Sequence, residues 1–356
     1  MNLTPQPDQL LRHHGDADAV PGMLDFAVNV HGSGPPEWLH KRLVTAVSGL
    51  GRYPSAAQDA AARAAVAARH SRDPAEVLVL SGVAEGFALL PALAPRSAVV
   101  VHPSFTEPEV ALRRAGLAVR RVLTDAAHRL RPERIPAEAD LVVLGNPTNP
   151  TSVLHPAEVL LGLARPGRVL VVDEAFADAQ PGEQESLAAD RDTPGLLVFR
   201  SLTKTWALPG LRAGYALGSP DLLARLAAPR PPWPVSTLVL EAVRACSSPA
   251  AVAEAAAAAV QTVRHREWMI HQLAGLPGVT VHQPAAAPFL LLRVPGGERV
   301  RAALAGAGIA VRRADTFPGL TPDHLRVAVR PPEIAAVLVD ELWTALGKAI
   351  PAETAW

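Results

Sequence analysis

Cysteine is almost absent from this sequence of 356 residues, in which Cys246 is the single example. One thiol cannot form an internal disulfide, and no neighbouring cysteines or histidines give it the spacing of a metal site. The first fifteen residues, MNLTPQPDQLLRHHG, also lack the cationic start and apolar core of a secretory signal. We therefore expect a soluble protein of the cytoplasm, a reducing compartment, without a bound metal.

An excess of charge of one sign is missing as well. Lysine and arginine together number 34, as do aspartate and glutamate, and charged residues make up 19% of the chain. Such a balanced protein has no overall field to attract nucleic acid or an anionic membrane surface. The chain also lacks an apolar run of about 18 residues that could span a bilayer. We predict neither a nucleic-acid partner nor a membrane partner.

Aromatic residues are scarce at 4%, and only two of them are tyrosines. Tyr53 precedes Pro54 between two helical segments, where it could pack half-buried or offer its hydroxyl to a phosphate. Phe105 lies in the loop HPSFTEPE after a strand-like run. Its ring could stack on a flat cofactor or fill the core. Position alone leaves both choices open.

Short apolar runs are plentiful, and they alternate with helical patterns. The runs are 77–80, 98–101, 141–144, 169–173 and 196–199. Strands that alternate with helices predict an α/β fold with a mostly parallel sheet. After the proline-rich segment APRPPWPVS, a long helical region and strands at 289–293 and 309–312 predict a smaller α+β lobe. We predict an amino-terminal arm over 1–40, a large domain over 41–245 and a small domain over 246–356.

Several candidate ligand-binding groups follow these strands. Gly82 to Ala84 form a strand-glycine-helix junction, whose free backbone N–H groups favour an anion. The stretch GNPTNPTS, residues 145–152, has its asparagine amides exposed by two Asn-Pro steps, so that one of them could donate to a ligand, and Asp173 ends a buried strand. Ligands of open α/β sheets bind outside the carboxyl ends of the strands, so these groups belong to one edge. For Asp173, capping the following loop is the alternative role.

The stretch SLTKTWALPGLRAGY, residues 201–215, contains the strongest chemical candidate. Lys204 follows an apolar strand and precedes a Pro-Gly turn and Arg212. A lysine that loses its proton near neutral pH can form a Schiff base, and burial beside another cation favours that loss. Ser201, Thr203 and Arg212 could hold a phosphate nearby by charge-assisted hydrogen bonds. A solvated loop lysine is the alternative that these neighbours argue against.

Three segments, RSLTKTWALPGLRAGY, VVDEAFAD and NPTNPT, resemble fold-type-I enzymes that use pyridoxal 5'-phosphate. The resemblance covers almost the whole chain and implies a three-layer, aspartate aminotransferase-like fold and a homodimer with shared active sites. It implies that Lys204 binds the cofactor covalently, that Asp173 faces the pyridine nitrogen, and that both are catalytic. The other residues that it implies for cofactor binding are Gly82, Val83, Ala84, Phe105, Asn149, Ser201, Thr203, Arg212 and, from the neighbouring subunit, Tyr53.

Within this superfamily the chain looks most like threonine-phosphate decarboxylases of cobalamin synthesis, which are relatives of histidinol-phosphate aminotransferases. Phe176 in place of a usual tyrosine, RPPWPVS and DTFPGLTPDHLRVAVR support this choice. The resemblance implies that Asn29 and Arg326 bind the amino-acid carboxylate and that Arg312 and His14 bind a distal phosphate. We therefore expect decarboxylation of O-phospho-threonine. The alternatives are transamination of histidinol phosphate or a related amino acid and, from another class, a non-catalytic ligand-binding relative.

Three departures from the decarboxylase pattern concern the substrate side. Ser152 stands where a glycine is usual, so a positive φ there would force the loop to sit differently. Asp16 replaces a glycine, and its carboxylate would repel a phosphate. His31 stands where a second asparagine is expected. These departures leave the expected cofactor site intact.

Overall fold

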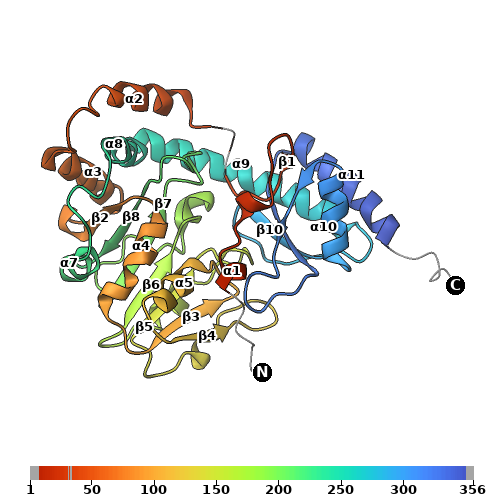
Figure 1. The fold of residues 1–356 in the computed structure, drawn as a ribbon, viewed down its shortest axis with the longest axis horizontal. Coiled ribbons are helices and arrows are strands. Elements are labelled where there is room, and N and C mark those ends of the chain that lie inside the picture. The colour runs from red at the N-terminus through yellow and green to blue at the C-terminus, as the bar shows by residue number, and fades with distance from the viewer. Residues whose placement is uncertain (1–7, 31, 33, 350–356) are drawn as a thin grey trace.

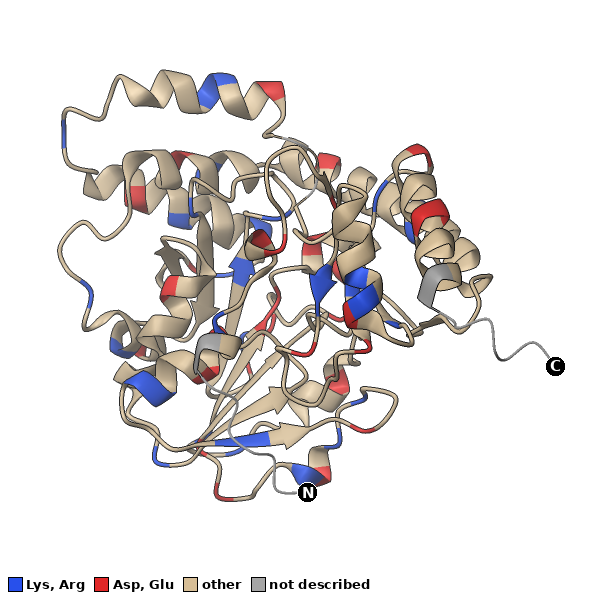
Figure 2. Cartoon of the chain, turned by 45° about the vertical axis from the view of Figure 1, so that its right-hand side comes forward, with Lys and Arg blue, Asp and Glu red and all other residues tan. Residues whose placement is uncertain are grey.

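The computed structural model describes residues 8–30, 32 and 34–349. These residues form a large lobe around a seven-stranded sheet and a smaller lobe around a four-stranded sheet, and the two lobes lie side by side (Figure 1). Basic and acidic residues are interspersed along the chain of both lobes, as the colours of Figure 2 show. In the described part of the chain, no helix is long and apolar enough to cross a membrane.

The large sheet has the strand order β2-β8-β7-β6-β5-β3-β4. All of its strands run parallel except β8, which is antiparallel to β2 and β7. The central strands are buried on both faces, and this is why they are continuous apolar runs, such as VLVVD in β6. Each parallel strand delivers the residues that follow it to the same edge of the sheet. The strands are β2 (Val77–Leu80), β3 (Ala98–His102), β4 (Val119–Leu123), β5 (Leu141–Gly145), β6 (Val169–Asp173), β7 (Leu196–Ser201) and β8 (Gly214–Gly218).

Helices cover both faces of this sheet, so the large lobe has three layers. Side chains alternate along each strand, and in β6 Val171 packs in the core on one face and Val172 in the core on the other. The first core includes residues of α4 (Val83–Leu89), α5 (Glu107–Arg114) and α7 (Pro220–Ala227). The second includes residues of α2 (Glu37–Val47), α3 (Ala56–Arg69), α6 (Ala157–Leu161) and α8 (Thr237–Cys246).

The small lobe is built on the antiparallel sheet β12-β13-β10-β9. The prediction of one strand over 309–312 was wrong, because β11 (Ile309–Ala310) and β12 (Arg312–Arg313) belong to different sheets. The former pairs in parallel with β1 (Leu24–Asp25) of the arm, whereas the latter pairs with β13. The remaining elements of this lobe are β9 (Thr280–Val281), β10 (Phe289–Arg293), α10 (Gly297–Gly306), β13 (His324–Ala328) and α11 (Pro332–Ala349).

One long helix, α9 (Pro249–Ala274), runs from the large lobe to the small one (Figure 1). The hydroxyl of Ser248 caps it by accepting a hydrogen bond from the backbone N–H of Ala251. The long helical region expected here is therefore two helices, α8 and α9, separated at Ser247 and Ser248. Two residues of α9 belong to the core of the large lobe and two to the core of the small lobe, namely Ala251 and Ala255, and Met269 and Leu273.

The amino-terminal arm contacts both lobes. The hydroxyl of Thr106, in the large lobe, donates to the carbonyl of Leu11 at the end of α1 (Asp8–Leu11). Farther along the arm, β1 joins the small lobe. The predicted division at residues 40 and 245 stays a prediction. The short 3-10 helices are η1 (Gly15–Ala17), η2 (Pro74–Glu76), η3 (Leu90–Leu93), η4 (Pro132–Arg134), η5 (Ala177–Ala179) and η6 (Pro181–Glu183).

Candidate active site

A cleft of about 490 Å³ lies at the carboxyl edge of the large sheet, between this edge, the arm and the small lobe. The structure brings together at its wall all but two of the residues that the sequence predicts for the site. The exceptions are Gly82, which lies directly behind the wall, and Tyr53. The predicted residues among those that line it are His14, Asn29, Val83, Ala84, Phe105, Asn149, Asp173, Ser201, Thr203, Lys204, Arg212, Arg312 and Arg326.

Lys204 lies in the turn between β7 and β8, where its amine is largely removed from water. Burial, together with the positive charges of Arg326 and Arg212, lowers the pKa of this amine from 10.5 to about 8. The carboxylates of Asp173 and Asp16 act in the opposite direction but do not cancel the effect. At pH 7 about a tenth of the amine is therefore uncharged, as a nucleophile or a general base needs to be, far more than for an ordinary lysine.

Asp173 ends β6 and lies in the same cleft. One of its carboxylate oxygens accepts a hydrogen bond of 3.1 Å from the backbone N–H of Ala175. Burial raises the pKa of this carboxyl to about 7, and the neighbouring carboxylate of Glu174 adds to the shift. A cation placed beside Asp173 would lower this pKa again, so the site favours a positively charged ring nitrogen. Glu174, the next residue, does not line the cleft, because neighbouring side chains at the end of a strand point to opposite sides.

The junction of β2 and α4 forms a cradle for an anion. Val83 and Ala84 open α4, so their backbone N–H groups have no carbonyl partner within the helix. Gly82 precedes them with a φ of 79°, and a Cβ at this position would lie 3.0 Å from a terminal nitrogen of Arg212. Only glycine therefore leaves room for the guanidinium to approach the helix. The hydroxyls of Ser201 and Thr203 lie on the same wall of the cleft.

Arg326, in β13, faces this cradle from the small lobe. One terminal nitrogen donates a hydrogen bond of 2.7 Å to the side-chain oxygen of Asn149, and the other donates to the carbonyl of Ala27. The contact orients Asn149 so that its NH₂ group remains to donate to a ligand. In the described residues, Nε of Arg326 and both amide atoms of Asn29 are buried without a hydrogen-bond partner. Such groups mark a place where a ligand completes the hydrogen bonding.

Arg312, in β12, has its guanidinium occupied by groups of the protein itself. It donates to the carbonyl of His13 at 2.6 Å and to the hydroxyl of Thr316 at 2.7 Å, and it pairs with the carboxylate of Asp18 at 3.4 Å. The plane of the guanidinium lies over the ring of Phe317, 5.0 Å from its centre. A substrate anion at Arg312 would therefore have to displace Asp18.

His14 is held by a second acid that sequence reasoning missed. Its Nε2 lies 2.7 Å from a carboxylate oxygen of Glu107, and its ring centre lies 5.4 Å from that of Phe105. Glu107 opens α5 directly after the loop of Phe105, and an acid at the start of a helix that follows a strand is the signal that could have found it. No comparable signal marks Asp18, because the arm has no periodic pattern there.

Ser152 follows the NPTNPT loop at the position where a glycine is usual. Ser152 itself adopts a φ of 64°, a left-handed conformation that glycine adopts more easily. The expectation that the loop sits differently from one with glycine stays a prediction. The hydroxyl of Ser152 accepts hydrogen bonds from the backbone N–H groups of Ala286 at 3.1 Å and Ala287 at 2.8 Å. These bonds tie the loop to the small lobe and offset the strain of the left-handed conformation. Asp16 lines the cleft, as expected, and His31 lies outside the described residues.

Tyr53 lies away from the cleft of its own chain. Its side chain is 73% exposed and stacks on Trp233, with the two ring centres 4.3 Å apart. Trp233, in the proline-rich segment, is itself 58% exposed. An exposed aromatic pair of this kind is typical of a surface that another chain covers. The predicted role of Tyr53 in a neighbouring subunit's site stays a prediction.

The site geometry agrees with a comparison to known proteins. The family model of aminotransferase class I and II matches residues 21–342. The chain belongs to the class I and II aminotransferase family. The predicted resemblance and the aspartate aminotransferase-like fold are thereby confirmed, and aspartate aminotransferase of Thermus thermophilus superimposes with a TM-score of 0.80 at 23% identity, over 97% of both chains.

The identities to two known relatives decide between the two predicted activities, transamination and decarboxylation. The chain is 52% identical to histidinol-phosphate aminotransferase of Mycobacterium tuberculosis over 341 residues, which are 95% of this chain and 93% of the relative. It is 32% identical to threonine-phosphate decarboxylase of Salmonella typhimurium, over 86% and 87% of the two chains. The expectation of a decarboxylase was therefore wrong. Phe176, one of the residues on which that expectation rested, lines the cleft and packs edge-on against Phe289.

Pyridoxal 5'-phosphate, the cofactor that the resemblance predicts, fits the cleft of this family member. The cradle behind Gly82 suits its phosphate, Asp173 suits a charged ring nitrogen, and the amine of Lys204 suits its aldehyde. The structure of histidinol-phosphate aminotransferase from Sinorhizobium meliloti in complex with this cofactor superimposes with a TM-score of 0.81 at 20% identity, over 98% of this chain and 96% of the other. Together with the family match over residues 21–342, the residues of the cleft confirm the cofactor prediction.

Proposed function

We propose that the protein is an aminotransferase that moves the amino group of histidinol phosphate to a keto acid. The identity of 52% to a histidinol-phosphate aminotransferase, along 95% of the chain, is the observation that carries this proposal. The cleft supports it, because the lysine, the carboxyl and the anion cradle that such a reaction needs all line one wall. A non-catalytic relative would need neither a buried amine of low pKa nor a carboxyl beside it.

The residues of the chain divide the chemistry between them. When bound, pyridoxal 5'-phosphate supplies an electron sink that stabilises negative charge on the substrate carbon. Asp173 keeps the ring nitrogen charged, and Asn149 donates its NH₂ group to a ring oxygen. Lys204, whose pKa is about 8, holds the proton that leaves the substrate carbon and can return it elsewhere. The hydroxyls of Ser201 and Thr203, with Arg212, fix the cofactor phosphate.

Histidinol phosphate carries its amine between a phosphate arm and an imidazole arm. We place the phosphate arm at Arg326 and Asn29, because the unpaired buried nitrogens there require no displacement of Asp18 from Arg312. We place the imidazole arm toward His14 and Glu107, because a carboxylate accepts from an imidazole N–H and repels a phosphate. A phosphate at Arg312, as the sequence predicts, is less favourable, because it would have to displace the carboxylate of Asp18.

The proposed enzyme is a cytoplasmic homodimer. The exposed pair of Tyr53 and Trp233 supports a chain-chain contact on that surface, and a partner chain there would bring the hydroxyl of Tyr53 to a second cleft. The single thiol, Cys246, is buried and unpaired, which suits a reducing compartment.

The test is amino transfer itself. We expect the purified protein, supplied with pyridoxal 5'-phosphate, to convert 2-oxoglutarate to glutamate in the presence of histidinol phosphate. The K204A variant should lose activity by at least about a thousandfold, since it lacks both nucleophile and base. The E107Q variant should raise KM for histidinol phosphate and leave KM for the keto acid unchanged. Absence of glutamate formation with the folded, cofactor-loaded protein would exclude the proposal.

A further inference from the structure

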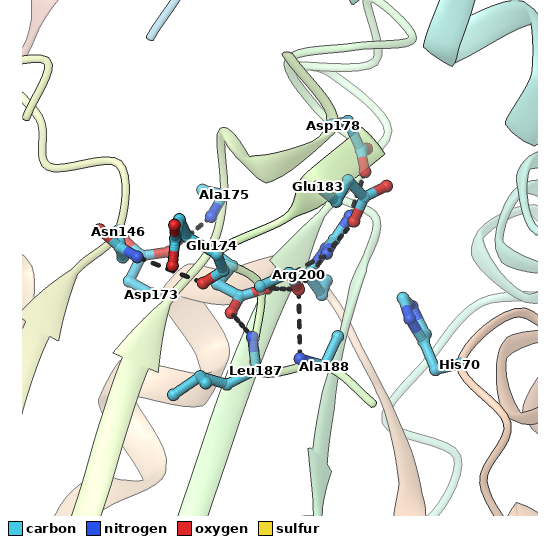
Figure 3. Close-up of polar contacts among 12 residues, drawn as sticks. His70, Asn146, Asp173, Glu174, Ala175, Asp178, Glu183, Leu187, Ala188 and Arg200 are labelled. Carbon is cyan, nitrogen blue, oxygen red and sulfur yellow. Dashed lines mark hydrogen bonds and ion pairs between the residues drawn. The ribbon is translucent and has the colours of Figure 1, made fainter. Parts of the chain in front are cut away.

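A cluster of buried charges lies directly beneath the wall of the cleft, on the opposite side of the strands that carry the site (Figure 3). Its centre is Arg200, the penultimate residue of β7, which is buried together with Glu174 and Asp178, whereas Glu183 is half-buried. Figure 3 shows this guanidinium between Glu174 on one side and Asp178 and Glu183 on the other. None of these four residues lines the cleft, so the chemistry described above does not use them.

Every charge of the cluster has several partners. One terminal nitrogen of Arg200 lies 3.1 Å from a carboxylate oxygen of Glu174 and 2.6 Å from one of Glu183, and the other nitrogen donates to Asp178. Glu174 also accepts from the hydroxyl of Ser186 at 2.5 Å. Arg69, from α3, adds a second guanidinium at 2.7 Å from Asp178. A buried charge network of this kind is rigid, because breaking any pair leaves an uncompensated charge.

The second carboxylate oxygen of Asp178 accepts a hydrogen bond of 3.3 Å from the hydroxyl of Thr205. Thr205 is the residue after Lys204. Glu174 is likewise the residue after Asp173, and Arg200 is the residue before Ser201. Three residues of the site, from two strands and one turn, thus each have an immediate chain neighbour anchored in the same network. Neighbours along a strand point to opposite sides, so anchoring Glu174 and Arg200 fixes the direction of Asp173 and Ser201. In the turn, the bond of Thr205 to Asp178 restrains the backbone that carries Lys204.

We propose that Arg200, Glu174, Asp178 and Thr205 are positioning residues, which hold Lys204, Asp173 and Ser201 at the geometry that the cofactor requires. Packing alone does not explain so many charges. Arg168, at the amino end of β6, is equally buried and is satisfied by backbone carbonyls of residues 136, 137, 139 and 163. Charged partners with fixed directions occur instead at the carboxyl edge, where the site needs precision.

Thr205 gives the mildest test. The T205V variant keeps the shape of the side chain and removes the bond to Asp178, whereas T205S keeps the hydroxyl. We expect T205V to weaken binding of pyridoxal 5'-phosphate about tenfold and to shift the pH midpoint of the absorbance of the lysine-bound cofactor. The T205S variant should restore both. The matched control is T262V, because the hydroxyl of Thr262 donates only to the carbonyl of Ala258 within α9.

Arginine variants give the stronger test. We expect R200K to weaken cofactor binding and shift the same pH midpoint by more than T205V does, since one ammonium cannot contact three carboxylates in fixed directions. The control R168K should lower the thermal unfolding temperature without moving either quantity. If R200K does not fold, the comparison of T205V with T205S tests the proposal by itself. Wild-type affinity and midpoint in the folded T205V variant would overturn the proposal, and the readouts need no substrate, so they do not depend on the proposed amino transfer.

Discussion

At the scale of single residues, the charge around Lys204 decides how readily it reacts. Arg326 lowers the pKa of the Lys204 amine, so its removal should raise that pKa from about 8 towards the ordinary value of 10.5. We predict that R326Q shifts the pH midpoint of labelling of the cofactor-free amine upwards. Labelling by an amine-specific reagent at a series of pH values, with the residue located by mass spectrometry, measures this midpoint. R313Q, outside the cleft lining, is the control, and equal shifts in both variants would contradict the prediction.

Asp173 gives a prediction on stability. Its carboxyl has a pKa of about 7 in the folded protein, whereas the ordinary value for an aspartate is 3.8. The folded protein therefore binds this proton more tightly than the unfolded chain, and stability is lost as the pH rises through this window. We predict that cofactor-free D173N gains stability over the wild type between about pH 4 and pH 7, with a constant difference above.

Urea unfolding of both cofactor-free proteins at pH 4, 6 and 8 measures the difference, and D221N, on the first turn of α7, serves as the control. Equal stability of D173N and wild type at pH 8 would show that the carboxyl is not held in a costly environment. The same variant should bind pyridoxal 5'-phosphate more weakly, because it lacks the charge that stabilises the ring nitrogen.

The residues that sequence reasoning found and missed differ in how far their partners lie along the chain. Lys204 and Asp173 follow apolar strands, and the topology of a parallel sheet alone brings them to one edge. Asp18 and Glu107 were missed because their contacts, with Arg312 and His14, join residues 294 and 93 positions apart. No local pattern reports such a contact. The hydrogen bonds of Ser152 could not be predicted for the same reason, because its hydroxyl accepts from backbone N–H groups of the other lobe.

At the scale of elements, α5 is fastened to the edge of the large sheet by one buried acid. Glu109 of α5 lies 2.9 Å from the ring nitrogen of His102 in β3 and 2.8 Å from Arg121 in β4. Burial alone would raise the pKa of Glu109, but the hydrogen bonds from His102 and Arg121 lower it to about 2. We predict that E109Q destabilises the protein by about 3 kcal/mol at neutral pH, because Arg121 is left buried without its counter-charge.

The difference between E109Q and wild type should shrink as the pH falls from about 4.5 towards 2, where the carboxylate itself becomes protonated. Urea unfolding at pH 7 and pH 3 measures it. The exposed acid Glu133 supplies the control E133Q, which should unfold like the wild type. A pH-independent difference would indicate that lost packing, rather than lost charge, is responsible.

Strands that begin with an unbroken apolar run were predicted to within two residues, because a strand buried on both faces has such a run in its sequence. The central strands β3, β5, β6 and β7 are of this kind. The predicted boundaries were wrong where a contact with a distant or capping residue determines where an element ends. The break between β11 and β12 exists because the arm pairs with the former, and the break between α8 and α9 depends on a serine cap within an otherwise helical sequence.

At the scale of the whole molecule, the predicted sharing of sites between subunits can be tested with mixed dimers. We predict that Y53F binds pyridoxal 5'-phosphate more weakly than wild type and that K204A is inactive. When the two are mixed and allowed to exchange subunits, roughly a quarter of the sites should combine an intact Lys204 with an intact Tyr53. Amino transfer at limiting cofactor should then exceed the mean of the two parents. Activity equal to that mean would place both residues of each site on one chain.

Because α9 contributes residues to the cores of both lobes, the position at which the chain is cut decides whether the two fragments are soluble. A fragment that stops at residue 245 would keep the seven-stranded sheet but lose Ala251 and Ala255, so water would reach the interior of the large lobe. The complementary piece would carry those alanines uncovered on a helix of about 39 Å. Each fragment would therefore expose apolar surface and tend to aggregate when it is produced alone. If the chain is instead cut at the exposed turn around Gly278, α9 stays attached to the large lobe. We expect the two fragments divided there to be more soluble when they are co-expressed.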